Sequence, residues 1–90
     1  MSRIVKWGIL GLGNIAYEFA KSFYNTNNAK LIAVASRSNH KLNTFKKEFK
    51  ISDKYLFTDY EKLINNNEVD IVYIALPNAF HYYWISKILS

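Results

Sequence analysis

The sequence has no cysteine, which excludes disulfide bonds, thiolate nucleophiles and zinc-thiolate sites. Its two histidines, His40 and His81, are too few for a histidine-rich metal site. The apolar stretches have the length of strands, so the sequence predicts no membrane-spanning helix. The N-terminus resembles a signal peptide only superficially, because glycines interrupt the apolar run that follows Lys6. We therefore expect a cytoplasmic protein that binds neither a metal nor a membrane.

Acidic residues are scarce: 7 Asp and Glu stand against 12 Lys and Arg, giving a formal net charge of +5. The lysines are scattered along the chain rather than gathered in one block, which favours solvated surface charge over a nucleic-acid interface. Half of the residues are apolar or aromatic and 21% are charged, as in soluble globular proteins. A length of 90 residues supports one domain with a thin core.

The apolar pattern alternates between strand and helix along the whole chain. It predicts strands at 3–10, 30–35, 54–57 and 69–76, and helices at 14–25, 39–49, about 60–65 and after 78. Ser38 is expected to cap the second helix, and Thr58 to Glu61 has the spacing of a capping box for the third. Because short connections join parallel strands through right-handed crossovers, we expect a Rossmann-like α/β fold. Its parallel sheet should have the order 3-2-1-4, helices on both faces, and no fifth strand within this chain.

Two apolar patterns predict how these elements are buried. In the first helix Ile15, Phe19 and Phe23 recur every four residues, so the pattern predicts a stripe packed on the sheet. The fourth predicted strand, 69–76, is almost continuously apolar and rich in β-branched residues. That composition is typical of a parallel strand that is buried on both faces, and we expect it to lie beside the first strand.

The loop from Gly11 to Ala16 follows the first strand directly and opens the first helix. In a dinucleotide-binding turn the first glycine permits the tight turn and the second lets the backbone approach a pyrophosphate. A small third residue, here Ala16, lets the helix pack closely on the strand. The amides at the start of the helix then receive the phosphates, which makes Gly11, Gly13, Asn14 and Ile15 candidate cofactor contacts.

After the second strand, an NAD-binding site would place a carboxylate on the ribose 2′-hydroxyl. This sequence has Ser36, Arg37 and Ser38 there. A guanidinium can bind a 2′-phosphate through paired charged hydrogen bonds and can stack on adenine, and Lys41 lies one turn further on. The sequence therefore favours NADP(H), with NAD(H) possible; the alternative for Arg37 is a solvated surface residue.

The fourth predicted strand ends at Leu76, Pro77 and Asn78, on the same edge of the sheet as the glycine loop. Considered alone, Asn78 is a candidate helix cap, and His81 is a first-turn residue with a partly exposed ring. The candidate cofactor-binding residues are thus Gly11, Gly13, Asn14, Ile15, Ser36, Arg37, Lys41, Leu76, Pro77, Asn78 and His81.

Four segments together resemble one family of enzymes: Gly8 to Ala16, Ala35 to Arg37, Tyr60 to Leu63, and Leu76 to His81. In this order and spacing they are similar to the glucose-fructose oxidoreductase, inositol dehydrogenase and rhizopine-catabolism (Gfo/Idh/MocA) family, over the whole chain. The resemblance implies an NAD(P)-dependent oxidoreductase acting on sugars, polyols or related hydroxy compounds. It also implies that Pro77 and Asn78 lie beside the nicotinamide and its ribose, with His81 on the adjoining helix.

Members of the family continue into a fifth strand that ends in Glu-Lys-Pro, and then into a substrate domain. Neither is present within residues 1–90, so no residue here is assigned an acid or base role in catalysis. We expect 1–90 to be the N-terminal portion of an NAD(P)-binding Rossmann domain that meets its sugar-like substrate only in a longer parent. The alternative is a non-catalytic Rossmann module for nucleotide binding or assembly. An unpaired edge on the fourth strand also predicts homo-oligomers.

Overall fold

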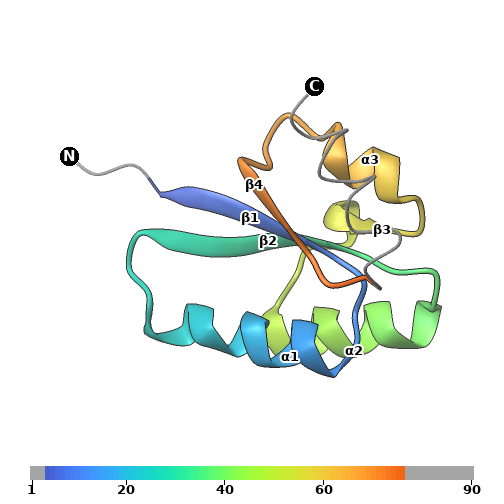
Figure 1. The fold of residues 1–90 in the computed structure, drawn as a ribbon, viewed down its shortest axis with the longest axis horizontal. Coiled ribbons are helices and arrows are strands. Elements are labelled where there is room, and N and C mark those ends of the chain that lie inside the picture. Colours follow the sequence, from blue (N-terminus) through green and yellow to red (C-terminus); the bar gives the residue numbers. More distant parts are fainter. Residues whose placement is uncertain (1–3, 77–90) are drawn as a thin grey trace.

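The computed structural model describes residues 4–76, which form one parallel sheet with helices on both faces. The strands are β1 (Val5–Leu10), β2 (Ala29–Ala35), β3 (Leu56–Phe57) and β4 (Ile71–Ile74), in the order β3-β2-β1-β4. The helices are α1 (Asn14–Lys21), α2 (Asn39–Phe49) and α3 (Tyr60–Ile64), with 3-10 turns η1 (Ser22–Asn25) and η2 (Asp53–Tyr55). Figure 1 shows α1 and α2 on one face of the sheet and α3 on the other. The predicted fold class and strand order are confirmed.

Side chains of the central strands alternate between two apolar cores, one on each face of the sheet. The first core, beneath α1 and α2, contains Ile9 and Val34, whereas the second, beneath α3, contains their neighbours Leu10 and Ala35. Leu63 of α3 is fully buried in the second core. Both faces of β1 and β2 are therefore covered, and this explains their nearly unbroken apolar sequences.

The first helix differs from the prediction in its stripe and in its end. Ala16 and Ala20 are buried, but Ile15 is 69% exposed, so it is not part of the core. Phe19 and Phe23, further along the segment, instead form an aromatic cluster with Trp7 and Tyr73 of the sheet. The rings of Phe19 and Tyr73 are stacked, with 4.0 Å between their centroids. The predicted stripe was therefore wrong at its first residue, which lies in the turn nearest the glycine loop.

The α-helical part of the first helix ends at Lys21, and the predicted remainder is the 3-10 turn η1. The Ser22 hydroxyl donates to the Phe19 carbonyl at 2.6 Å, and the Thr26 hydroxyl donates to the Ser22 carbonyl at 3.0 Å. Such local bonds from side chain to backbone compete with the α-helical pattern and tighten its last turn.

The second helix has its predicted bounds, and the Ser38 side chain accepts from the Lys41 amide as a cap. For α3 the capping prediction was wrong in its residue: Asp59, not Thr58, is the N-cap and accepts from the Glu61 amide at 3.0 Å. Asp59 has the extended backbone of an N-cap, which aims its short carboxylate at that amide.

The outer strands are shorter than predicted. Only two residues of the predicted third strand pair with β2, because the 3-10 turn η2 takes up the residues before Leu56. β4 lies beside β1 as expected, but Ile71 is 43% exposed, so β4 is not buried on both faces. Within residues 4–76, β4 is an edge strand of the sheet. No helix in this part of the chain is long and apolar enough to cross a bilayer.

The absence of a side chain at Gly8 allows α3 to pack closely on β1. A Cβ added at Gly8 would lie 2.9 Å from Cδ2 of the fully buried Leu63. We expect Gly8→Ala to lower the free energy of unfolding by about 1–3 kcal/mol through overpacking. Leu63→Ala should cost about 2–5 kcal/mol through its cavity. Because the new methyl group fills part of that cavity, the double variant should lose less than the sum.

Urea denaturation of the three variants and the parent chain measures these free energies. Strictly additive losses, or an unchanged midpoint for Gly8→Ala, would show that α3 and β1 are not in close contact.

Candidate functional site

The four parallel strands end in register at one edge of the sheet. Pairing across the sheet joins the last residues of the strands, which are Leu10, Ala35, Phe57 and Ile74. Backbone hydrogen bonds continue just beyond them: the Gly11 amide donates to the Ala35 carbonyl at 2.9 Å, and the Ala75 amide donates to the Leu10 carbonyl at 2.9 Å. The loops after β1, β2 and β4 are therefore brought to one edge, where ligands of open α/β sheets bind.

Gly11 makes the turn that directs the chain from β1 into α1. Its φ of +83° is in the left-handed region that side chains disfavour. A Cβ at this position would lie 2.8 Å from the Ala75 carbonyl oxygen and 2.7 Å from Cδ2 of Leu76. Gly11 is thus required both by its backbone conformation and by the close approach of the chain after β4.

Gly13 and the residues that follow it present an exposed helix start. Gly13 is the N-cap of α1, and among residues 4–76 no atom beyond its two neighbours in the chain lies within 4 Å of the position that a Cβ would take. Because glycine has no side chain to cap the helix, the first amides of α1 remain available to an anion. Asn14 and Ile15 are exposed beside them. This geometry suits the close approach of a phosphate group.

The loop after β2 is ordered by its two serine side chains. Ser36 is only 5% exposed, and its hydroxyl oxygen accepts from the Ser38 amide at 3.1 Å. The Ser38 oxygen in turn accepts from the Lys41 amide at 3.3 Å. These bonds hold the exposed Arg37 between two fixed neighbours at the carboxyl edge of the sheet.

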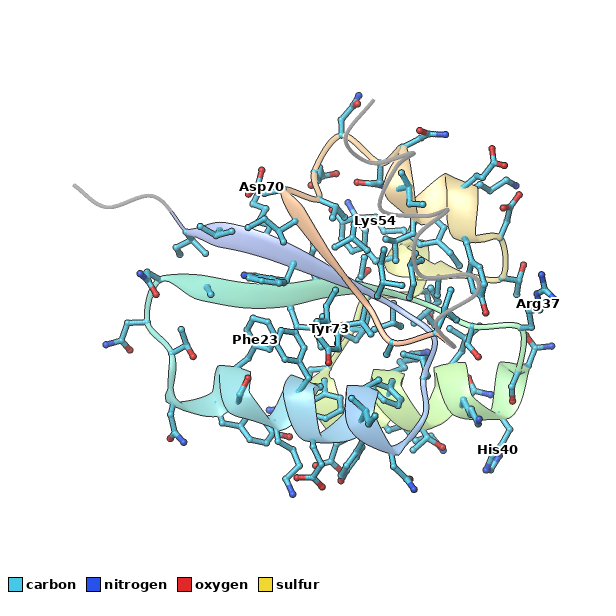
Figure 2. The ribbon with its side chains drawn as sticks, in the orientation of Figure 1. Phe23, Arg37, His40, Lys54, Asp70 and Tyr73 are labelled. Carbon is cyan, nitrogen blue, oxygen red and sulfur yellow. The ribbon has the colours of Figure 1, made fainter. Side chains whose placement is uncertain are left out.

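The cation of this loop, Arg37, and the cation in the first turn of α2, Lys41, lie in different surroundings. The guanidinium carbon of Arg37 is 5.6 Å from the ring centroid of Tyr60, the first residue of α3. Lys41 instead lines a groove of about 450 Å³ between α1 and α2. The other residues of that groove are Leu12, Gly13, Asn14, Tyr17, His40, Thr44 and Phe45. Figure 2 shows Arg37 and His40 near the start of α2.

The structure brings together the candidate residues of the glycine loop, the Ser36 to Arg37 loop, Lys41 and Leu76 at this end of the sheet. Pro77, Asn78 and His81 lie outside the described residues. Tyr60 was not among the predicted site residues, although it lies in the predicted capping segment and in one of the four segments that resemble the family. A signal was available, since Tyr60 follows the third strand, which the predicted order places next to the second.

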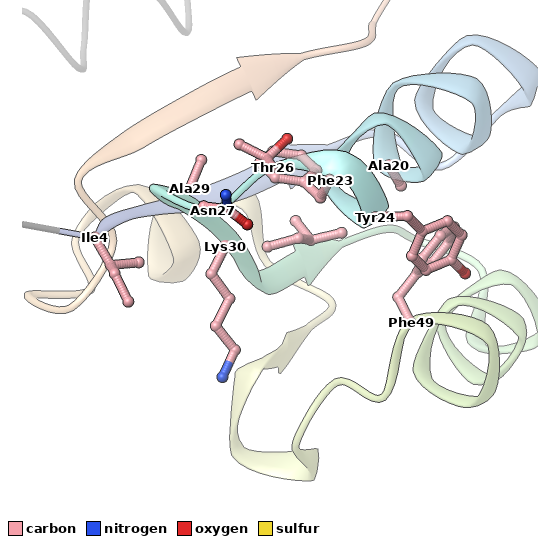
Figure 3. Close-up of a pocket in the computed structure, with 10 residues that line it drawn as sticks. Ile4, Ala20, Phe23, Tyr24, Thr26, Asn27, Ala29, Lys30 and Phe49 are labelled. Atoms are coloured by element: carbon pink, nitrogen blue, oxygen red, sulfur yellow. The ribbon is translucent and has the colours of Figure 1, made fainter.

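A second groove, of about 310 Å³, lies at the opposite end of the sheet (Figure 3). It is formed where β1 and β2 begin, with Ala29, Lys30 and the aromatic rings of Phe23, Tyr24 and Phe49 in its wall. Among residues 4–76, it shares no lining residue with the groove beside the glycine loop. The glycine turn and the exposed start of α1 are at the other edge of the sheet, the carboxyl edge, where open α/β sheets bind ligands, so this second groove lies apart from them.

Residues 5–90 match the family model GFO_IDH_MocA, described as "Oxidoreductase family, NAD-binding Rossmann fold". The chain belongs to this family. It is 35% identical over 82 residues to Oxidoreductase P35 of Formosa agariphila, a match that covers 90% of this chain and 25% of that protein. The chain thus spans about a quarter of the length of this Gfo/Idh/MocA relative.

Solved structures of Gfo/Idh/MocA-like enzymes have the same fold. Apo scyllo-inositol dehydrogenase from Lactobacillus casei is 30% identical, with a TM-score of 0.89 over 99% of this chain and 26% of that one. The same enzyme has been solved with bound NAD(H) and scyllo-inositol. KijD10, a 3-ketoreductase from Actinomadura kijaniata solved with TDP-benzene and NADP, is 26% identical, with a TM-score of 0.84 over 97% of this chain and 27% of that one.

The fold requires glycine at position 11 but not at position 13, and the effect of an alanine substitution on stability measures this difference. Gly11→Ala should lower the free energy of unfolding by more than about 1 kcal/mol, because its positive φ and its close neighbours both oppose a side chain. Gly13→Ala should lower it by less, about 0.5 kcal/mol, the cost of a poorer N-cap, since its φ is negative and the added methyl group meets no other described residue. Urea denaturation followed by circular dichroism gives both values, and equal losses would contradict the described turn.

Proposed function

We propose that this chain provides the cofactor-binding part of an NADP(H)-preferring oxidoreductase that acts on sugars, polyols or related hydroxy compounds. Membership of the Gfo/Idh/MocA family supports the nicotinamide dinucleotide as the class of ligand. Relatives named for inositol and for a 3-ketoreductase support this class of substrate. Because the match spans about a quarter of each relative, we assign substrate selection and acid-base catalysis to residues outside this chain.

The preference for NADP(H) rests on one observation, the position of Arg37 at the carboxyl end of β2. An enzyme that prefers NAD(H) typically has a carboxylate there to bind the ribose 2′-hydroxyl. Arg37 is exposed at this edge, and its planar donors match the geometry of a phosphate. Solved relatives have been captured with NAD(H) and with NADP, so residue 37 of this chain, not its family, carries the proposed preference.

Each part of the site has a separate role in this proposal. The amides after Gly13 receive the pyrophosphate, with Asn14 and Ile15 beside it. Arg37 binds the 2′-phosphate, and Lys41, in the first turn of α2, is a weaker second contact for it. We assign the nicotinamide side of the site to Leu76 and, outside the described residues, to Pro77, Asn78 and His81. When bound, the cofactor supplies or accepts a hydride, while the chain binds it and fixes its orientation.

Charge reversal at Arg37 tests the proposed cofactor preference. Arg37→Glu should raise the dissociation constant of NADPH at least about tenfold, because a charge-assisted pair becomes a repulsion. The dissociation constant of NADH, which lacks the 2′-phosphate, should change little. Quenching of tryptophan fluorescence during titration with each cofactor measures both constants.

Two control variants complete this experiment. Lys47→Glu makes the same change in net charge near the far end of α2 and should leave the ratio of the two constants unaltered. Gly13→Ala should weaken NADPH and NADH alike, since it affects only the shared pyrophosphate contact. If Arg37→Glu also weakened both cofactors equally, Arg37 would not be a 2′-phosphate contact.

We also propose that the chain associates with itself through β4. β4 pairs with β1 on one side, and no strand among residues 4–76 pairs with its other side. Ile71 on this edge is 43% exposed, and apolar edge strands readily pair with another chain.

Ile71→Lys tests the proposed association, because a lysine on an edge strand opposes pairing. The parent chain should sediment as a dimer or larger species at micromolar concentrations, and the variant as a monomer. Ile15→Lys is the matched control, since Ile15 is also an exposed isoleucine but lies on α1 and not on the edge strand β4. A parent chain that sediments as a monomer would refute the proposal.

A further inference from the structure

Tyr60 lies where the loop after β2 meets the start of α3. It is the first residue of α3, is partly buried, and packs against the second core. The Ser36 amide donates to the Phe57 carbonyl at 3.0 Å, which ties the two segments together a few residues before Tyr60. The Asp59 cap fixes the helix start. The ring of Tyr60 therefore has a firm position relative to the backbone of Arg37.

The guanidinium of Arg37 is placed over this ring, with 5.6 Å between its central carbon and the ring centroid. A cation on the face of an aromatic ring is attracted by the ring electrons and gives up none of its N–H donors. A carboxylate partner would instead occupy two donors and neutralise the charge. Neither ion pair described within residues 4–76 involves Arg37. Its contact with Tyr60 thus holds the guanidinium in place while leaving its charge and donors for an anion.

Pre-arrangement matters because arginine side chains lose conformational freedom when they bind a ligand. An arginine that is already held near its binding position loses less conformational entropy when the ligand binds. The free energy of binding is then more favourable, and the affinity is higher. The benefit applies only to ligands that Arg37 contacts. Within the proposed function, that means the 2′-phosphate of NADP(H) and not the 2′-hydroxyl of NAD(H).

We propose that Tyr60 is a positioning residue for cofactor specificity: its ring holds the Arg37 guanidinium at the carboxyl edge of the sheet, ready to bind the adenosine 2′-phosphate. This inference rests on the proposed preference for NADP(H). Tyr60 acts through Arg37, so its removal changes the affinity for NADPH and leaves that for NADH unaltered.

The test compares Tyr60→Leu, which removes the ring, with Tyr60→Phe, which keeps it. Dissociation constants for NADPH and NADH are measured by fluorescence titration of the whole chain. Tyr60→Leu should weaken NADPH about two- to fivefold, the effect expected of an exposed cation–π contact. NADH should bind as in the parent, and Tyr60→Phe should bind both cofactors as the parent does. Loss of NADPH and NADH binding in equal measure would mean a structural role and would overturn the proposal.

A second cation–π pair in the same fold provides a matched control. Lys54 lies over the ring of Tyr55 at 5.0 Å, and the Tyr55 hydroxyl donates to the Glu68 carboxylate at 2.6 Å. The hydrogen bond to Glu68 raises the pKa of the Tyr55 phenol. Tyr55→Leu removes a comparable ring from a pair that does not include Arg37. It should leave the ratio of NADPH to NADH affinity unaltered, and a selective loss of NADPH would overturn the assignment to Tyr60.

Variants of Arg37 separate this inference from the proposed function. In an Arg37→Ala background, Tyr60→Leu should cause no further loss of NADPH affinity, because Tyr60 then has nothing to position. If Arg37→Glu weakens the binding of NADPH alone but Tyr60→Leu has no effect, the proposed role of Tyr60 is refuted while the proposed preference for NADP(H) stands. If Arg37→Glu weakens the binding of NADPH and NADH equally, the proposed preference for NADP(H) is refuted, and the inference about Tyr60, which rests on it, is refuted with it.

A spectroscopic measurement on the unaltered chain keeps the proposal testable if Tyr60→Leu does not fold. The Tyr60 ring current should displace the side-chain proton resonances of Arg37 from their usual positions, and Tyr60→Phe should preserve the displacement. Resonances of Arg37 at ordinary positions would overturn the proposal.

Discussion

The contact between Gly11 and the chain just after β4 is the constraint on which the candidate site depends. The left-handed turn at Gly11 ends β1, and the position of a Cβ there is taken by the Ala75 carbonyl and the Leu76 side chain. One glycine thereby sets the direction in which the chain leaves β1 and enters α1, and it lets the loop after β4 lie against the loop after β1. The exposed amides beyond Gly13 face the carboxyl edge of the sheet as a consequence, because α1 starts immediately after the turn.

The two cores have different parts in maintaining that edge. α1 and α2 share the first core, so both helices are held on the same face of the sheet. α3 lies over the second core, and Gly8 lets it approach β1 closely enough for Leu63 to be fully buried. The place of α3 determines where Tyr60 stands. The packing of α3 on β1 at Gly8 therefore affects the position of the Arg37 side chain at the carboxyl edge of the sheet, because Arg37 contacts Tyr60.

Much of the fold was predictable because its signals are local. The bounds of α2 and its Ser38 cap follow from side-chain spacing and from a single hydrogen bond. The errors arose where local pattern and surroundings differ. Ile15 continues an apolar stripe but is 69% exposed, whereas its neighbour Ala16 in the same turn is buried in the first core. Thr58 and Asp59 are both acceptable caps, and only the backbone direction at the start of α3 selects Asp59.

The sequence by itself determined the strand order, the glycine turn and the presence of a cation where a carboxylate would indicate NAD(H). Each follows from residue type and spacing within short segments, which fix local backbone conformation and the order of crossovers. Only the tertiary structure decided that Arg37 lies over Tyr60 while Lys41 lines the groove between α1 and α2. These contacts join residues far apart in the chain through packing on opposite faces of one sheet, and no local pattern carries that information.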